Sequence, residues 1–208
     1  MRILVTGDSL IARHEGLDQP MIDYYLKKVL PDLEISNTAV SGSNTADLLE
    51  NLPTFFPTAD FEMVFILIGT NDLALNKQLP LKKFQKNLVK ILQENKKIYP
   101  ASRICLISPP AVDESKQKFR NNHLIAHYSC WMQRSAELQH SEFIDLQQMM
   151  QNQPNFLQLT QGSLNDGLHF GKRGYLLLAS LIKEQLAFKL PKIKITEYYP
   201  ESPAAFSS

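Results

Sequence analysis

The chain has 208 residues, of which 44% are hydrophobic, and its 22 basic and 21 acidic side chains leave a formal net charge of +1. This length and composition predict one soluble globular domain, and the balanced charge argues against a nucleic-acid partner. Cys105 and Cys130 are too few for a disulfide framework, and no apolar run approaches the ~18 residues of a membrane span. Since Met1 leads directly into an apolar run without a cleavable signal, we expect a cytoplasmic protein.

Apolar runs alternate with segments of helical periodicity along the chain. We expect strands at residues 2–7, 33–40, 63–69, 103–108 and 142–146, and helices at 19–30, 45–52, 81–99, about 121–138 and 173–188. The third run, MVFILIG, is apolar almost throughout, which is typical of parallel strands that helices cover on both faces. The pattern predicts a single doubly wound α/β domain over residues 1–190, followed by a C-terminal tail at 191–208.

The first strand ends in VTGDS, and this stretch has two interpretations. A dinucleotide-binding loop would need two further glycines, but none occurs among the six residues after Gly7, and Asp8 would repel a phosphate. A P-loop is excluded because no glycine-lysine-serine/threonine sequence exists in the chain. The remaining interpretation is a hydrolase in which Ser9 is the nucleophile at the carboxyl end of the first strand, where ligands bind in such sheets.

A serine nucleophile needs a base, and His169 is the strongest of five histidines. It lies in NDGLH, just before the last helix, and Asp166 three residues earlier can turn back and accept a hydrogen bond from its ring. A surface Asp-Gly turn is the simpler alternative. His123 and His127 have a spacing of four residues that suits a metal, but HLIAH lacks the glutamate of the zinc-protease motif, so we expect a helix surface there.

Donors for a developing oxyanion follow the second and third strands. Gly42, in SGS, lets a backbone N–H approach a reacting group closely, and Asn71, in GTND, can direct its side-chain amide there. Each stretch alone also fits an ordinary turn. Together with Ser9 and the Asp-x-x-His sequence, they predict polar groups that converge on one edge of the sheet.

These four blocks, in this order, resemble the SGNH hydrolases, also called the GDSL family of esterases and lipases. The matching stretches are VTGDSL, the Asn37–Gly42 block, GTND and DGLHFGKRGY, and the resemblance spans residues 3 to about 186. Relatives often carry glycine where this chain has Ala39, which is a small change. The resemblance implies a three-layer α/β/α fold with a five-stranded, mainly parallel, flavodoxin-like sheet.

The resemblance also implies a mechanism. Ser9, Asp166 and His169 would form a catalytic triad, and the backbone N–H groups of Ser9 and Gly42 with the Asn71 side chain would form an oxyanion hole. No metal or organic cofactor is expected, and Asp8 and Asp72 would brace loops. The expected function is hydrolysis of a small or medium acyl ester through an acyl-serine intermediate, with a small-molecule substrate.

Several alternatives stay open at this point. A thioesterase, a lysophospholipase or a carbohydrate deacetylase would use the same residues, because the loops select the substrate. A non-catalytic binding module on the same fold is a further alternative, although the intact Ser, Asp and His argue against it. A nucleotide-binding oxidoreductase is disfavoured by the missing glycines. The sequence does not indicate an oligomeric state.

Overall fold

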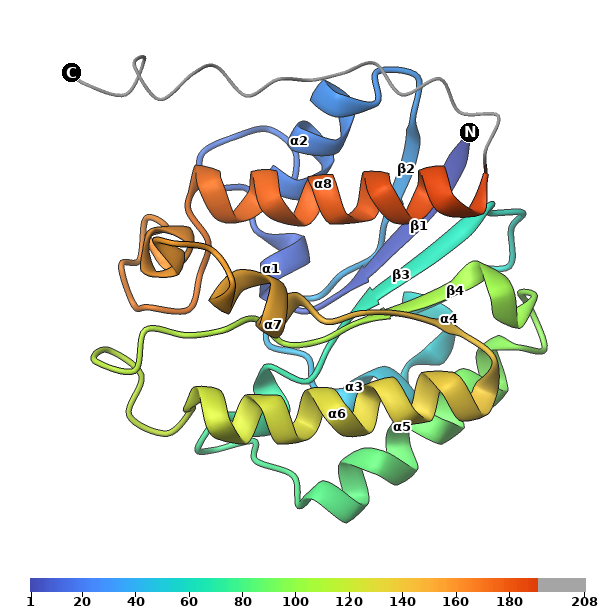
Figure 1. Cartoon of the computed structure of the whole chain (residues 1–208). Coiled ribbons are helices and arrows are strands. Elements are labelled where there is room, and N and C mark those ends of the chain that lie inside the picture. The colour runs from blue at the N-terminus through green and yellow to red at the C-terminus, as the bar shows by residue number, and fades with distance from the viewer. Residues whose placement is uncertain (191–208) are drawn as a thin grey trace.

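The computed structural model describes residues 1–190, so the predicted tail at 191–208 lies outside the described residues. Five parallel strands form one sheet in the order β2-β1-β3-β4-β5, and helices cover both of its faces (Figure 1). This order is the flavodoxin-like one, and the predicted three-layer α/β/α architecture is confirmed. The strands are β1 (Arg2–Gly7), β2 (Glu34–Asn37), β3 (Met63–Leu67), β4 (Ile104–Ile107) and β5 (Glu142–Ile144).

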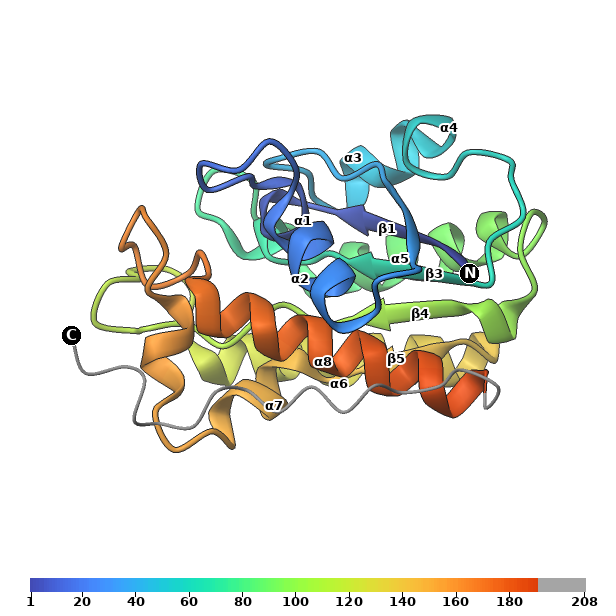
Figure 2. The same cartoon turned by 90° about the horizontal axis from the view of Figure 1, so that it is seen from above.

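The two faces of the sheet bury separate apolar clusters, as the near-continuous apolar runs predict. Alternate residues of β3 point to opposite faces, so Phe65 belongs to one cluster and Ile66 to the other. Helices α2 (Met21–Val29) and α8 (Lys172–Lys189) pack on the first face, and α3 (Thr45–Glu50), α5 (Leu81–Asn95) and α6 (Asn122–Gln139) on the second (Figure 2). All five predicted long helices are therefore present.

Some boundaries differ from the prediction for local reasons. The second strand was predicted over 33–40 but spans only Glu34–Asn37, four residues that pair with residues 2–5 of β1 at the edge of the sheet. Two further hydrogen bonds, from Thr38 N to Val5 O and from Val40 N to Gly7 O, keep the chain beside β1 beyond that strand. Helix α5 ends at Asn95 rather than near residue 99, and the following residues form turns.

Short helices were missed because they are too brief to show periodicity. They are α1 (Ser9–Ala12), α4 (Leu52–Phe55), α7 (Leu146–Gln151) and the 3₁₀ turns η1 (Asn71–Leu73), η2 (Ala101–Arg103) and η3 (Phe156–Thr160). Two of them, α1 and η1, begin at Ser9 and Asn71, residues that the sequence singled out.

Within residues 1–190, no helix combines the length and the apolar character that crossing a membrane requires.

Candidate active site

Ser9, His169 and Asp166 form a continuous hydrogen-bonded chain beyond the carboxyl end of β1. Ser9 Oγ lies 3.0 Å from His169 Nε2, across 160 residues of sequence. The other ring nitrogen, His169 Nδ1, lies 2.7 Å from Asp166 Oδ2. All three residues are partly buried, which leaves the group accessible. The order hydroxyl, imidazole, carboxylate is the one that lets a histidine remove a proton from a serine.

Ser9 is held in place by the two residues that precede it, Gly7 at the end of β1 and Asp8 before α1. The Asp8 carboxylate caps α1 by accepting from Leu10 N at 2.9 Å, so the helix begins at Ser9. Gly7 has φ +144, and a Cβ there would lie 1.9 Å from the carbonyl oxygen of Leu67. Only glycine therefore allows β1 to pass this close to β3 immediately before the serine.

The turn that carries Asp166 and His169 is organised by the aspartate itself. Asp166 Oδ1 accepts from the backbone N–H groups of Leu168 and His169, both at 3.0 Å, while Oδ2 meets the ring. Burial favours the neutral acid, but these hydrogen bonds outweigh it and hold the pKa of Asp166 below its usual range. Asp166 is therefore a carboxylate at neutral pH, which orients the ring so that Nε2 faces Ser9.

Gly42 and Asn71 lie in two turns that are joined by a hydrogen bond. Asn71 Nδ2 donates to the carbonyl of Ser43 at 2.9 Å, and Gly42 has φ +84, a conformation that favours glycine. Val40 N also donates to the carbonyl of Gly7, two residues before Ser9. This bond joins the turn after β2 to the end of β1. Since β2, β1 and β3 are neighbours in the sheet, the three predicted turns meet at one edge.

Buried aspartates support these turns, as the resemblance implied. Asp72 Oδ2 accepts from Thr45 N at 3.0 Å, and Oδ1 also meets the Thr45 hydroxyl. Burial raises the pKa of Asp72 to about 6 and, for the completely buried Asp8, to about 7. Neither carboxylate takes part in the chain of Ser9, His169 and Asp166.

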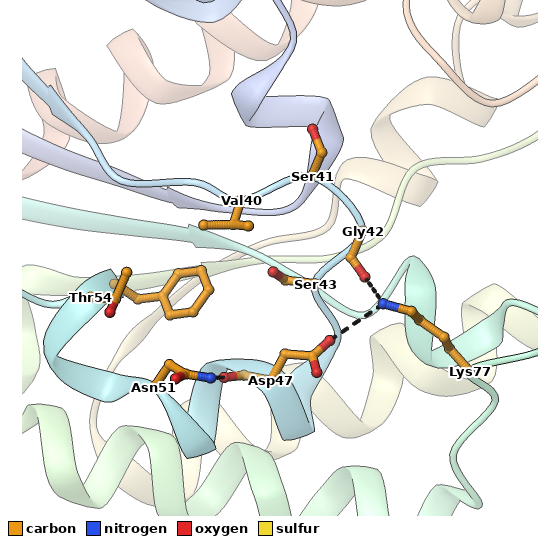
Figure 3. A pocket seen from close by; sticks show the side chains of 9 residues that line it. Val40, Ser41, Gly42, Ser43, Asp47, Asn51, Thr54 and Lys77 are labelled. Atoms are coloured by element: carbon orange, nitrogen blue, oxygen red, sulfur yellow. Dashed lines mark hydrogen bonds and ion pairs between the residues drawn. The ribbon is translucent and has the colours of Figure 1, made fainter.

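A cavity of about 360 Å³ adjoins Gly42 (Figure 3). Lys77, which the sequence did not point to, donates to the Gly42 carbonyl at 2.7 Å and lies 3.7 Å from the Asp47 carboxylate. No motif marks this lysine, which sits in a polar loop. The cavity is lined by backbone or side chains of Val40, Ser41, Gly42, Ser43, Asp47, Asn51, Thr54, Phe55 and Lys77, most of them polar.

The other histidine candidates are elsewhere. His123 and His127 lie on exposed positions of α6 with ring centroids 5.9 Å apart, as expected for a helix surface. Within residues 1–190, no three His, Cys, Asp or Glu side chains are grouped so that they could hold a metal ion.

Comparison with known proteins gives consistent matches. The model of the GDSL-like Lipase/Acylhydrolase family matches residues 5–177. Among solved structures, the lipase/acylhydrolase from Enterococcus faecalis superposes with a TM-score of 0.78 and 26% identity, over 95% of this chain and all of that one.

Two curated proteins match with longer chains. An N-acylneuraminate cytidylyltransferase from Escherichia coli O18:K1:H7 is 29% identical over 173 residues, which are 79% of this chain and 38% of that protein. A GDSL esterase/lipase from Arabidopsis thaliana is 30% identical over 125 residues, which are 54% of this chain and 50% of that protein. The chain thus spans half or less of the length of these curated relatives.

Proposed function

The chain belongs to the GDSL-like lipase/acylhydrolase family, and from this premise we propose that it is an ester hydrolase whose nucleophile is Ser9. The observation that supports this most strongly is the chain of short contacts from Ser9 Oγ through both ring nitrogens of His169 to Asp166. A serine hydroxyl at neutral pH is a weak nucleophile, and a base at 3.0 Å removes that limitation.

The proposed reaction has two halves. Ser9 Oγ attacks the acyl carbonyl while His169 Nε2 takes the hydroxyl proton, and the same proton then passes to the leaving alcohol oxygen as the ester C–O bond breaks. Water, deprotonated by His169, attacks the acyl-serine and releases the carboxylic acid. Asp166 keeps the imidazole in the tautomer with its proton on Nδ1 and stabilises the cation that forms.

The oxyanion of each tetrahedral intermediate is assigned three donors. They are the backbone N–H groups of Ser9 and Gly42 and the side-chain amide of Asn71. One N–H of the Asn71 amide is bound to the Ser43 carbonyl, and this bond fixes the plane of the amide. Because an amide has two N–H donors, the second stays available for the oxyanion.

For the substrate we propose a small or medium acyl ester of a polar alcohol. The cavity beside Gly42 supports this, because the residues that line it include the charged Asp47 and Lys77 and the polar Thr54. Such groups solvate hydroxyl-bearing compounds, for example an acetylated sugar, better than they solvate a long alkyl chain.

The experiment that tests the function is hydrolysis of p-nitrophenyl esters of increasing acyl length by the wild type and by Ser9→Ala. We expect the wild type to hydrolyse short esters, and Ser9→Ala to lose nearly all activity, with ~10³-fold residual catalysis over water. Ser102→Ala is the matched control, because Ser102 is exposed at the amino end of β4, and it should keep full activity.

A second measurement, covalent labelling of the serine, applies if the wild type does not hydrolyse p-nitrophenyl esters. A fluorophosphonate should label Ser9 in the wild type and in Ser102→Ala, since labelling needs only an activated serine. Absence of both hydrolysis and labelling would disprove the proposal and favour a binding module.

A further inference from the structure

The residues between β4 and α6 contain a bridge that joins two turns of the candidate site. Arg120 Nε donates to the carbonyl of Thr70 at 2.9 Å, and Thr70 directly precedes Asn71. Arg120 Nη1 donates to Gln117 Oε1 at 2.9 Å, and Gln117 Nε2 donates to the carbonyl of Asp166 at 2.7 Å. Three hydrogen bonds therefore connect the turn of the proposed oxyanion donor to the turn of the proposed triad acid.

The same residues, which we call the 113–120 segment, also contact the chain on both sides of Asp166. Asp113 N donates to the carbonyl of Gly167 at 2.8 Å, and Lys116 Nζ donates to Asn165 Oδ1 at 2.6 Å. Gly167 has φ +77, and a Cβ there would lie 2.9 Å from the Cβ atoms of both Asp113 and Lys116. The segment thus packs directly against the backbone of the turn.

The 113–120 segment is itself anchored at its base. Asn122, at the start of α6, accepts from Val112 N and donates to Val112 O, both at 2.9 Å. This pair of bonds closes the segment into a loop whose ends are fixed. Because its ends are fixed, this loop can hold the backbone of Asp166 at a set distance from Thr70.

Arg120 is suited to this task by its geometry. It is partly buried, and within residues 1–190 it makes no direct ion pair; its bonded acceptors are a carbonyl and an amide oxygen. Burial lowers the pKa of Arg120, and the charges of Asp8 and Asp166 oppose that effect. The rigid guanidinium fork supplies two donors in fixed directions, which a flexible ammonium does not.

We propose that Arg120 and Gln117 are positioning residues for hydrolysis, and this inference rests on the proposed function. They fix the distance between the Asn71 amide and the Asp166–His169 turn, so that the oxyanion donor and the base meet one substrate at once. A displacement of about 1 Å between such groups can lower a rate by ~10²-fold. Because the hydrogen bonds of the bridge go to the backbone of Thr70 and Asp166, we expect it to act on kcat rather than on substrate binding.

The test uses substitutions that remove one bond at a time. Gln117→Glu keeps an acceptor for Arg120 but removes the donor to the Asp166 carbonyl, and Gln117→Ala removes both. Arg120→Lys keeps the charge but replaces the planar guanidinium, with its two donors in fixed directions, by a single ammonium on a flexible chain. Lys118→Ala is the matched control, because Lys118 is exposed in the same segment.

We expect kcat on a p-nitrophenyl ester to fall about 10- to 100-fold in Gln117→Glu, Gln117→Ala and Arg120→Lys, with KM changed less than about 3-fold. Lys118→Ala should match the wild type. Each kcat is divided by the concentration of enzyme that a fluorophosphonate labels to completion, so that unfolded protein does not enter the value.

Two results would overturn the inference. One is a kcat per labelled site within about 2-fold of the wild type, with only a lower Tm, which would mean that the bridge merely stabilises the fold. The other is a raised KM at unchanged kcat, which would mean that these side chains bind substrate. Failure of the proposed function itself is distinguishable, because Ser9→Ala would then keep the wild-type rate.

Discussion

Two aspartates near the candidate site have opposite pKa shifts because their surroundings differ. Asp166 is partly exposed and accepts three hydrogen bonds, so its charged form is favoured. Asp8 is completely buried, and burial raises its pKa more than the hydrogen bonds of Leu10 and Thr70 and the charge of Arg120 lower it, so its neutral form is favoured. At the scale of single residues, one carboxyl group thus belongs to the proposed triad and another caps the helix that begins at the proposed nucleophile, Ser9.

Ionisation of Asp8 should make stability depend on pH. Its pKa rises from 3.8 to about 7 on folding, so between these values the folded chain binds the extra proton. The contribution of Asp8 to stability is therefore greatest below pH 3.8 and is lost as the pH rises to about 7. Asp8→Asn cannot ionise and keeps an acceptor for Leu10 N, so it should be more stable than the wild type at pH 8.

The measurement is urea unfolding at pH 5 and pH 8. We expect Asp8→Asn to gain on the order of 2–4 kcal/mol at pH 8 and clearly less at pH 5. Asp18→Asn is the control, because Asp18 is exposed, and it should show no such difference. An equal effect of Asp8→Asn at both pH values would show that Asp8 does not titrate in this range.

The second prediction at the residue scale concerns Asn71. Asn71→Ala removes a proposed oxyanion donor while Ser9, His169 and Asp166 remain. We therefore expect kcat to fall about 10²- to 10³-fold with a smaller change in KM, measured on the ester that the wild type hydrolyses best. Fluorophosphonate labelling of Ser9 should persist. A full kcat in Asn71→Ala would remove Asn71 from the oxyanion hole.

At the scale of elements, two helices begin at the candidate site and depend on close backbone contacts. Helix α1 has four residues, too few to be stable alone, and it forms because Asp8 caps it and Leu10 and Ile11 are buried. Helix α8 begins at Lys172, three residues after His169. Its Gly174 lies against the carbonyl of Leu159, so α8 fixes the chain that leads back to the Asp166–His169 turn.

Gly174 allows a test of this contact. In an exposed helix, replacing glycine by alanine stabilises by up to about 1 kcal/mol. Here an added Cβ would lie 2.5 Å from the Leu159 oxygen and 2.8 Å from Phe170 Cβ, and backbone cannot move aside cheaply. Gly174→Ala should therefore lower Tm, in thermal unfolding, by several degrees. Ser180→Ala on the same helix should leave Tm nearly unchanged, and a raised Tm in Gly174→Ala would contradict the packing argument.

At the scale of the whole molecule, the strand order determines which turns meet. The order β2-β1-β3 places the strand that ends before Ser9 between the strands that precede Gly42 and Asn71. His169 and Asp166 come from the far end of the sequence and approach the same edge through the turn before α8. The sheet thus gathers, around one serine, groups separated by up to 160 residues of sequence.

Much of this could be predicted from the sequence. The buried strands β1, β3 and β4 are recognisable because apolar residues on both faces leave an uninterrupted run. The candidate residues Ser9, Gly42, Asn71, Asp166 and His169 were identified because each follows a strand or precedes a helix within a short, specific block. These are local properties, and neighbouring residues are enough to determine them.

Other features depend on the tertiary structure alone. Helix α1 is too short for any periodicity, and no sequence pattern marks the end of β2 at Asn37, opposite Val5 of β1. The bridge of Arg120 and Gln117 joins residues 49 and 50 positions apart, and no motif marks either side chain. The raised pKa of Asp8 follows from complete burial. Sequence blocks therefore indicate the candidate reactive groups. The distances between these groups and their charge states are decided only by the tertiary structure, because loops that are remote in sequence come together there and exclude water.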